Sequence, residues 1–168
     1  VYNTNHGIWM DWMAQGTVVS NNLVFGCNQY DLYFEVNHGP FLVANNILLS
    51  ERSLWDWSDG GAFVHNLIKG HIGGGKKQVR ETPYFLHHST NGMKIKNITG
   101  GDARYINNIL VGKKASLTDY DKSLIRSKMV GNVFLNHAVP TNQEQRPLLI
   151  VSNFDPAIKL SKKADGFY

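Results

Sequence analysis

The chain has 168 residues, of which 42% are hydrophobic and 16 are glycine, so it is long enough for one ordinary domain. Its formal net charge of +4 comes from scattered lysine pairs without interleaved aromatic residues, which argues against a nucleic-acid partner. No apolar run approaches the roughly eighteen residues of a membrane span, and the single cysteine excludes an internal disulfide while leaving the compartment undecided.

Three segments near the start of the chain share one pattern, a short apolar strand that contains a single carboxylate. Ten or eleven residues after each carboxylate, an asparagine opens a second apolar run. The strands cover residues 7–12, 31–36 and 53–57; their carboxylates are Asp11, Glu35 and Asp56, and the asparagines are Asn22, Asn46 and Asn66.

The pattern repeats with a nearly constant period. The step from Asp11 to Glu35 is 24 residues and the step from Glu35 to Asp56 is 21, and the asparagine motif returns at Asn108 and Asn132. A period in this range, with two or three strands and no helical stretch between them, predicts an all-β fold, a parallel β-helix in which coils stack on one another. We expect the asparagines to hydrogen-bond one another along the stack.

The repeats predict a single domain over residues 1–168, with coils to about residue 138 and a terminal extension over 139–168. The glycine-rich run at 72–77 breaks the pattern and is predicted to be a loop. Because the chain begins abruptly at Val1, without a capping element, we expect it to be a piece of a longer protein. An open end of a stack exposes strand edges, so self-association through that end is expected.

Alternation along a strand predicts which side chains share a face. In this interpretation the three carboxylates form one outward-facing ladder, beside Trp9 and Tyr33. The opposite face is apolar and is predicted to form the interior: Met10, Trp12, Phe34, Val36, Trp55 and Trp57.

A ladder of like charges on neighbouring strands is destabilising unless it has a use. A bound cation is one use, and acid and nucleophile chemistry on a sugar is another. Neighbouring strands place carboxyls close to the 5–5.5 Å separation of retaining glycosidases, rather than the roughly 6.5–9.5 Å of inverting ones. Glu35 has an acid on either side in this ladder, which suits a general acid, whereas an end member suits a nucleophile.

The flanking residues favour the sugar over the cation. Calcium sites recruit several carbonyl and carboxylate oxygens, whereas here aromatic rings flank the acids. No zinc spacing or Ser-His-Asp pattern is present, so we expect no metal and no cofactor. Additional candidates for substrate binding are His38, Asp56, His88 and Arg104. The pair His87-His88, together with Arg80 and Arg104, could line a sugar pocket, although the spacing does not demand it.

Residues 7–16 and 31–40 resemble the β-xylosidases of glycoside hydrolase family 120, and the similarity continues through 57–61 and 65–67. It is weaker at 82–84, 88–90 and 100–102. The resemblance implies a right-handed parallel β-helix and a retaining β-xylosidase that acts on short xylo-oligosaccharides. It places the nucleophile on Asp11 and the acid/base on Glu35, and it assigns no role to Asp56. The family's proteins are much longer, with earlier coils and a β-sandwich insert.

Two other functions stay open at this point. One is a non-catalytic β-helix that binds glycans. The other is a calcium-dependent lyase acting on uronic-acid polymers, although no convincing base lies beside the acids.

Overall fold

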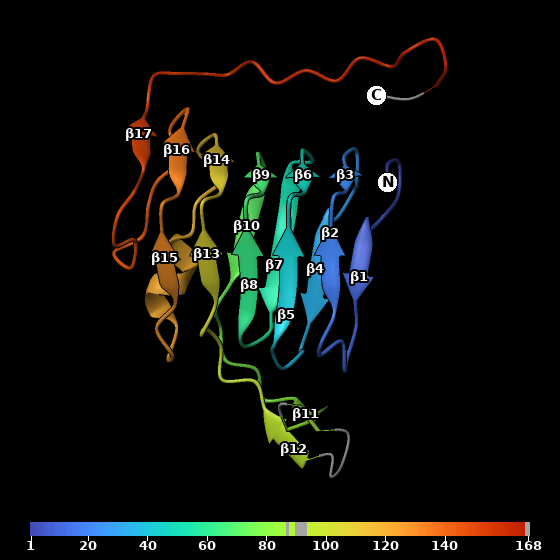
Figure 1. Cartoon of the computed structure of the whole chain (residues 1–168), viewed down its shortest axis with the longest axis vertical. Coiled ribbons are helices and arrows are strands. Elements are labelled where there is room, and N and C mark those ends of the chain that lie inside the picture. The colour runs from blue at the N-terminus through green and yellow to red at the C-terminus, as the bar shows by residue number, and fades with distance from the viewer. Residues whose placement is uncertain (87, 90–93, 167–168) are drawn as a thin grey trace.

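The computed structural model describes residues 1–86, 88–89 and 94–166, and within these the chain is almost entirely β-structure (Figure 1). The described residues contain a single helix, a 3-10 turn at Thr118–Lys122. None of them forms a helix long and apolar enough to cross a membrane.

Most strands belong to three parallel sheets, and each of the first four coils of the chain contributes one strand to each sheet. The first sheet, here called the acid sheet, contains β1 (Ile8–Met10), β4 (Leu32–Glu35), β7 (Arg52–Trp57) and β10 (His71–Gly74) in that order. The second contains β2 (Val18–Ser20), β5 (Phe41–Ala44), β8 (Gly61–Val64), β13 (Arg104–Ile106) and β15 (Lys128–Val130). The third contains β3 (Leu23–Val24), β6 (Ile47–Leu48), β9 (Leu67–Ile68), β14 (Ile109–Val111), β16 (Val133–Leu135) and β17 (Leu149–Val151). This arrangement is consistent with the predicted parallel β-helix.

Alternating side chains fill the space between the sheets. In β4, β5 and β8, every second residue is buried, as expected for strands with one face toward a core. The rings of Phe34 and Phe41 stack at 4.6 Å, and those of Phe63 and Tyr105 stack at 4.5 Å. The first pair joins two sheets within one coil and the second joins two consecutive coils, so aromatic packing runs both across and along the core.

The asparagine ladder is confirmed. The side-chain nitrogen of Asn46 donates to the side-chain oxygen of Asn66, and Asn66 donates to Asn108 in the same way, both at 3.0 Å. The same oxygens also accept the backbone N–H of the preceding asparagine at 2.9 Å. Each rung thus satisfies a buried amide and a buried backbone donor, and the ladder begins at Asn22 and ends at Asn132.

The predicted register of the third acidic strand is wrong by one residue. Phe34 pairs with Asp56, and Glu35 pairs with Trp57, so the step between these strands is 22 residues rather than 21. A slip of one residue exchanges the two faces of a strand. Asp56 therefore lies in the interior, with a relative exposure of 1%, and Trp55 and Trp57 lie on the outer face.

Of the other residues predicted to be interior, three are buried or partly buried and one is exposed. Phe34 and Val36 are buried as expected, and Met10 is partly buried against the core. Trp12 is 46% exposed because it lies beyond the end of β1, where the alternation of the strand no longer applies.

An antiparallel hairpin, β11 (Glu81–Tyr84) and β12 (Lys94–Asn97), interrupts the repeat between β10 and β13. It projects from the end of the stack at which the acid-sheet strands finish (Figure 1). This insertion explains why the asparagine motif skips one period between Asn66 and Asn108. Part of the predicted 72–77 loop is instead strand β10, which pairs with β7.

The C-terminal region also differs from expectation. Strand β17 pairs with β16 and adds another rung to the third sheet, so the stack continues past residue 138 to Val151. Residues 152–166 then run as an extended segment across the tips of the strands toward the N-terminal end (Figure 1).

Candidate active site

The two carboxylates of the candidate site lie at the ends of neighbouring strands. Glu35 is the last residue of β4, and Asp11 directly follows β1. Met10 pairs with Phe34, and Asp11 and Glu35 are the residues that follow this last pair. Their backbones therefore lie close together, where two strands with a spacing of roughly 4.7–4.9 Å finish. Burial raises the pKa of Tyr33, and the negative charges of Glu35 and Asp11 raise it further, because both acids lie near the phenol.

Each oxygen of Glu35 accepts a hydrogen bond from a different part of the chain. Nη1 of Arg80 lies 2.7 Å from Oε1, and Nε1 of Trp9 lies 3.2 Å from Oε2. Arg80 comes from the segment that leads into the hairpin, and its guanidinium lies 5.6 Å from the ring centroid of Trp12. The Glu35 carboxylate is therefore held in one orientation from two sides.

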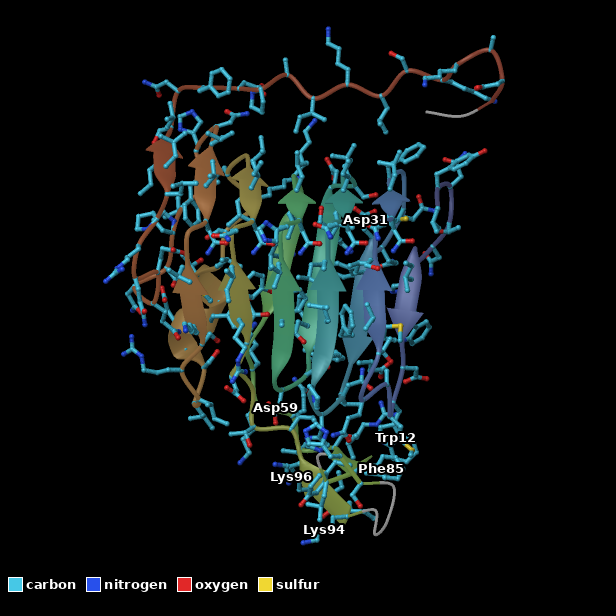
Figure 2. All side chains as sticks on the ribbon, viewed as in Figure 1. Trp12, Asp31, Asp59, Phe85, Lys94 and Lys96 are labelled. Atoms are coloured by element: carbon cyan, nitrogen blue, oxygen red, sulfur yellow. The ribbon has the colours of Figure 1, made fainter. Side chains whose placement is uncertain are left out.

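The hairpin forms a wall beside the pair. The backbone N–H of Trp12 donates to Oδ1 of Asp11 at 2.7 Å, and the indole N–H of Trp12 donates to Oγ1 of Thr82 at 3.1 Å. The side chain of Gln15 both donates to and accepts from the backbone of Phe85. Trp12 and Phe85 accordingly lie where the hairpin meets the stack (Figure 2).

Aromatic rings form the floor of the site. Trp9 is 52% exposed and lies edge-on to Tyr33 at 5.6 Å, and Tyr33 lies edge-on to Trp57 at 6.0 Å. His6 packs against both Trp9 and Tyr33. A carboxylate pair on a floor of partly exposed rings suits a substrate with both hydroxyl groups and apolar C–H faces, because aromatic residues offer apolar faces beside polar edges.

The structure does not bring Asp56 to this site. Its carboxylate is enclosed by the core, where Oδ2 accepts from the Tyr120 hydroxyl at 2.8 Å and Oδ1 from the Ser58 backbone at 3.1 Å. The Tyr105 hydroxyl lies 2.9 Å from that of Tyr120 and completes the network. Burial raises the pKa of Asp56 from 3.8 to about 7. Glu35 consequently has an acid on one side only, and the argument that placed it between two acids does not hold.

His38 and Arg104 do not lie beside the acid pair. Nε2 of His38 is 3.1 Å from the carbonyl oxygens of both Thr82 and Lys96, so this buried ring holds the hairpin to the stack. Arg104 pairs with Asp102 at 2.9 Å. Both residues line a groove of about 580 Å³ between the hairpin and the second sheet.

The remaining predicted residue, His88, is exposed in the turn that follows β11, and no described contact links it to the acids. His87 lies outside the described residues. The sequence did not predict that Arg80 lies beside Glu35, because the two residues are 45 positions apart and Arg80 leads into a hairpin that falls outside the repeat.

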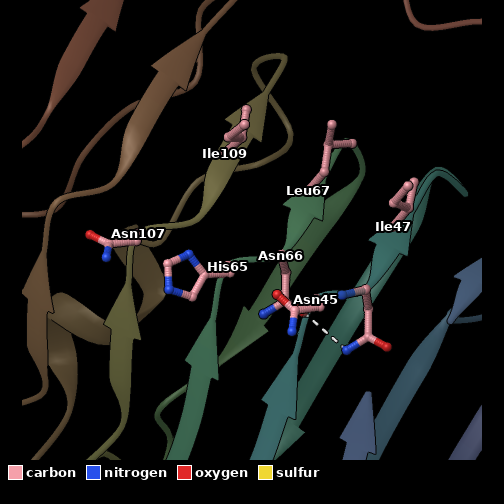
Figure 3. Close-up of a pocket in the computed structure, with 8 residues that line it drawn as sticks. Asn45, Ile47, His65, Asn66, Leu67, Asn107 and Ile109 are labelled. Carbon is pink, nitrogen blue, oxygen red and sulfur yellow. Dashed lines mark hydrogen bonds between the residues drawn. The ribbon is translucent and has the colours of Figure 1, made fainter. Parts of the chain in front are cut away.

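Another hollow, of about 330 Å³, lies on the outside of the third sheet (Figure 3). Aliphatic side chains line one side of it and asparagines and a histidine line the other, without any carboxylate: Asn45, Asn46, Ile47, His65, Asn66, Leu67, Asn107 and Ile109. This hollow therefore offers none of the acid chemistry of the pair on the acid sheet. Within the described ranges, no group of three or more His, Cys, Asp or Glu side chains is placed to hold a metal ion.

Comparison with known proteins gives one informative similarity. No protein-family model matches the chain, and no curated protein matches it. Among solved structures, a chain with the same arrangement of strands belongs to a protein that was solved in complex with xylose. That protein is XylC, which is 33% identical to this chain with a TM-score of 0.84. The match covers 96% of this chain and 29% of XylC, so the chain spans less than a third of the length of XylC.

Proposed function

We propose that this chain carries the catalytic acids of a retaining β-xylosidase with the right-handed parallel β-helix fold of glycoside hydrolase family 120. The observation that carries the proposal is that Asp11 and Glu35 directly follow Met10 and Phe34, which pair on neighbouring strands, on an aromatic floor. The likeness to XylC, whose structure holds xylose, supports the choice of sugar.

The proposed mechanism is a double displacement. In the first step Asp11 attacks the anomeric carbon while Glu35 gives its proton to the leaving oxygen, so a covalent glycosyl ester forms on Asp11 and the glycosidic bond breaks. In the second step Glu35 removes a proton from water, and the water oxygen displaces the ester at the same carbon. Asp11 is released as a carboxylate and xylose leaves with its configuration retained.

The spacing of the strands that carry the two acids favours a retaining mechanism over an inverting one. Retaining glycosidases hold their two carboxyls about 5–5.5 Å apart, and adjacent strands have a spacing close to that value. An inverting enzyme holds its carboxyls roughly 6.5–9.5 Å apart to leave room for a water molecule, which is wider than one strand spacing. The division of roles between the two acids follows the family motif rather than their positions on the sheet.

The two donors on Glu35 have a defined part in the proposal. Arg80 and Trp9 fix the carboxylate relative to Asp11, which is the positioning that a proton transfer requires. A proton on one oxygen of Glu35 takes the place of one of these hydrogen bonds, so we expect one donor to turn to the substrate when it binds. The proposed substrate is a xylo-oligosaccharide, and the mechanism uses no metal or cofactor.

The test is covalent labelling with a mechanism-based inactivator, a 2-fluoro xyloside with an activated leaving group, followed by peptide mass spectrometry. The expected result is one label on Asp11, absent from Asp11→Asn and retained in Asp155→Asn, a matched change at an exposed carboxylate. A label on another carboxylate would remove Asp11 as the nucleophile. The absence of any label, together with xylose binding, would favour a non-catalytic glycan-binding module, which the exposed aromatic floor also suits.

A further inference from the structure

The aromatic floor does not end at the acid pair. It continues across β7 and β10 as a set of partly exposed rings, here called the outer aromatic patch: Tyr30, Trp55, Trp57 and His71. Tyr30 lies 5.9 Å from Tyr33, and Trp55 lies 5.4 Å from both Tyr30 and Trp57. His71 lies 6.2 Å from Trp55 with the two ring planes nearly parallel. The rings from Trp9 to His71 thus form one continuous surface.

The backbone of the last strand is shaped to this surface. Trp9, Tyr33 and Trp55 occupy equivalent positions on three consecutive strands, and the next position is Gly73. A Cβ atom on Gly73 would lie 2.4 Å from the ring of Trp55, so only glycine lets the indole lie over β10. On the same face, the rings of Trp57, Trp55 and Tyr30 follow one another with centroids 5.4 Å apart at each step, so the surface is long enough for more than one sugar ring.

The far end of the patch is polar. Tyr30 and His71 border a hollow of about 500 Å³ whose other walls are Glu51, Arg52 and Lys114. Burial lowers the pKa of His71, which keeps its imidazole neutral and able both to donate and to accept a hydrogen bond. Aromatic faces followed by charged and neutral hydrogen-bonding groups match a ligand whose rings have apolar faces and hydroxyl edges.

The order of the acids gives the patch a direction. Asp11 directly follows β1 and Glu35 ends β4, so Glu35 lies between the nucleophile and β7 in the order of the sheet. A general acid protonates the leaving oxygen, so the leaving part of the substrate must lie on the Glu35 side of the bond that breaks. The outer aromatic patch begins on that side, at Trp57, which pairs with Glu35.

We propose that the outer aromatic patch binds the leaving-group residues of a β-linked oligosaccharide, so that the chain acts on substrates longer than a disaccharide. Each successive sugar packs a C–H face against Trp57, Trp55 and Tyr30 in turn, and the hollow beside His71 receives the last ring. The direction of binding rests on the proposed function, whereas binding itself does not. The alternative to sugar binding is a purely structural role, in which these rings only shield the acid sheet from water.

Binding is measured first, by titration calorimetry with xylobiose, xylotetraose and xylohexaose, on the Asp11→Asn protein so that no turnover occurs. We expect affinity to rise about tenfold from the disaccharide to the tetraose, and Trp55→Ala and His71→Ala in the same background to remove most of that rise. Phe154→Ala is the matched control, since Phe154 is 52% exposed on the C-terminal segment, away from the acid sheet. Circular dichroism checks that each variant is folded.

Kinetics then test the direction. In the protein with both acids, the ratio of kcat/KM for xylotetraose to that for an aryl xyloside should fall about tenfold in Trp55→Ala and His71→Ala, and should not fall in Phe154→Ala. Affinity independent of chain length, or equal losses for short and long ligands, would overturn the patch. If Trp55→Ala does not fold, the His71→Ala result decides. Length-dependent binding without labelling of Asp11 would keep the patch and remove the proposed catalysis.

Discussion

Two columns of side chains run along the same stack and differ in what they repeat. At the turn between the second and third sheets, five coils carry asparagine, and the inner rungs make the same two hydrogen bonds. On the outer face of the acid sheet, the column that holds Asp11 and Glu35 changes to tryptophan at Trp57. A position that meets the same structural need in every coil keeps one residue. A position that changes from coil to coil is free to carry chemistry.

The two columns also differ in burial. Asn46, Asn66, Asn108 and Asn132 are each no more than 1% exposed, so their amides have only protein partners. Asp11 is exposed, and 18% of the Glu35 side chain is exposed. Changes in the asparagine column should therefore alter the free energy of unfolding, whereas changes in the acid column should alter rates.

The sharpest test of this contrast is Glu35→Gln. It should slow hydrolysis of xylosides with poor leaving groups by about 10²–10⁴-fold, because glutamine cannot donate the proton that they need. Xylosides with acidic leaving groups should be slowed far less in the first step. The measurement is kcat/KM against leaving-group acidity, with Asp155→Asn, a change at an exposed carboxylate, as the control. An equal loss for all leaving groups would mean that Glu35 is not the general acid.

The two faces of β4 provide the next test. Phe34 is 1% exposed and packs between Phe41 and Phe63, so Phe34→Ala should lower the free energy of unfolding by roughly 3–5 kcal/mol. Tyr33 precedes it on the opposite, partly exposed face, and Tyr33→Ala should cost about 1 kcal/mol. Urea unfolding of both variants gives the comparison. Equal costs would show that the face of the sheet does not decide the role of a residue.

Asp56 sets a pH dependence on stability. Because burial raises its pKa from 3.8 to about 7, the folded chain holds this proton over a pH range in which the unfolded chain has lost it. The stabilising effect of the proton is complete below about pH 4 and is lost as pH rises through about 7. Asp56→Asn stays neutral and keeps an amide that fits the Tyr120 and Ser58 partners.

The difference in unfolding free energy between Asp56→Asn and the parent protein should therefore move in favour of the variant by up to about 4 kcal/mol between pH 4 and pH 8. Urea unfolding across this range measures it. Asp155→Asn, a change at an exposed carboxylate, should show no such trend. A flat difference for Asp56→Asn would mean that the buried carboxyl does not titrate in this range.

Within the asparagine ladder, position should matter. Asn66→Ala leaves the backbone N–H and the amide of Asn46 without their acceptor, so it should cost about 2–3 kcal/mol of unfolding free energy. Asn22→Ala lies at the partly exposed end of the ladder, where water replaces the lost partners, and should cost about 1 kcal/mol. Thermal and urea unfolding would measure both. A larger cost for Asn22→Ala than for Asn66→Ala would mean that burial does not decide how much each asparagine of the ladder contributes to stability.

The sequence predicted the coils well because asparagine marks a turn that every coil must make. It predicted the face of the third acidic strand wrongly, because the carboxylates were aligned with one another and not with their neighbours. The register of these strands is better predicted by aligning an aliphatic residue that is followed by an aromatic one. Ile8-Trp9, Leu32-Tyr33 and Leu54-Trp55 pair across the sheet, and this alignment puts Asp56 inside.

The parts of the site that the sequence did not predict come from outside the repeat. Arg80 and Thr82 belong to the hairpin and its approach, and their partners Glu35 and Trp12 lie 45 and 70 residues away. Periodicity carries information only about positions that recur from coil to coil. An insertion that folds back over one end of the stack leaves no such trace, so its contacts emerge only from the three-dimensional arrangement.

Arg80→Ala is expected to have the smallest effect on stability. It therefore tests whether a residue beside the acid column can affect the rate without affecting the unfolding free energy. The Arg80 side chain is 49% exposed, and ion pairs in such settings contribute about 0–1 kcal/mol, so Arg80→Ala should leave the unfolding free energy nearly unchanged. The same change should lower kcat/KM for xylosides about tenfold, because Glu35 loses one of the two donors that fix it. Arg80→Lys keeps the charge without the planar donor geometry and should recover only part of the rate.

Lys76→Ala is the matched control, since Lys76 also forms an exposed ion pair, with Asp119 at 3.9 Å, away from the acids. Its rate should equal that of the parent protein. If Arg80→Ala and Lys76→Ala had the same rates, the guanidinium would not position Glu35, and the hairpin would serve only as a wall. A loss of rate in Arg80→Ala without a loss of stability would instead show that the insertion supplies function to an otherwise repetitive stack.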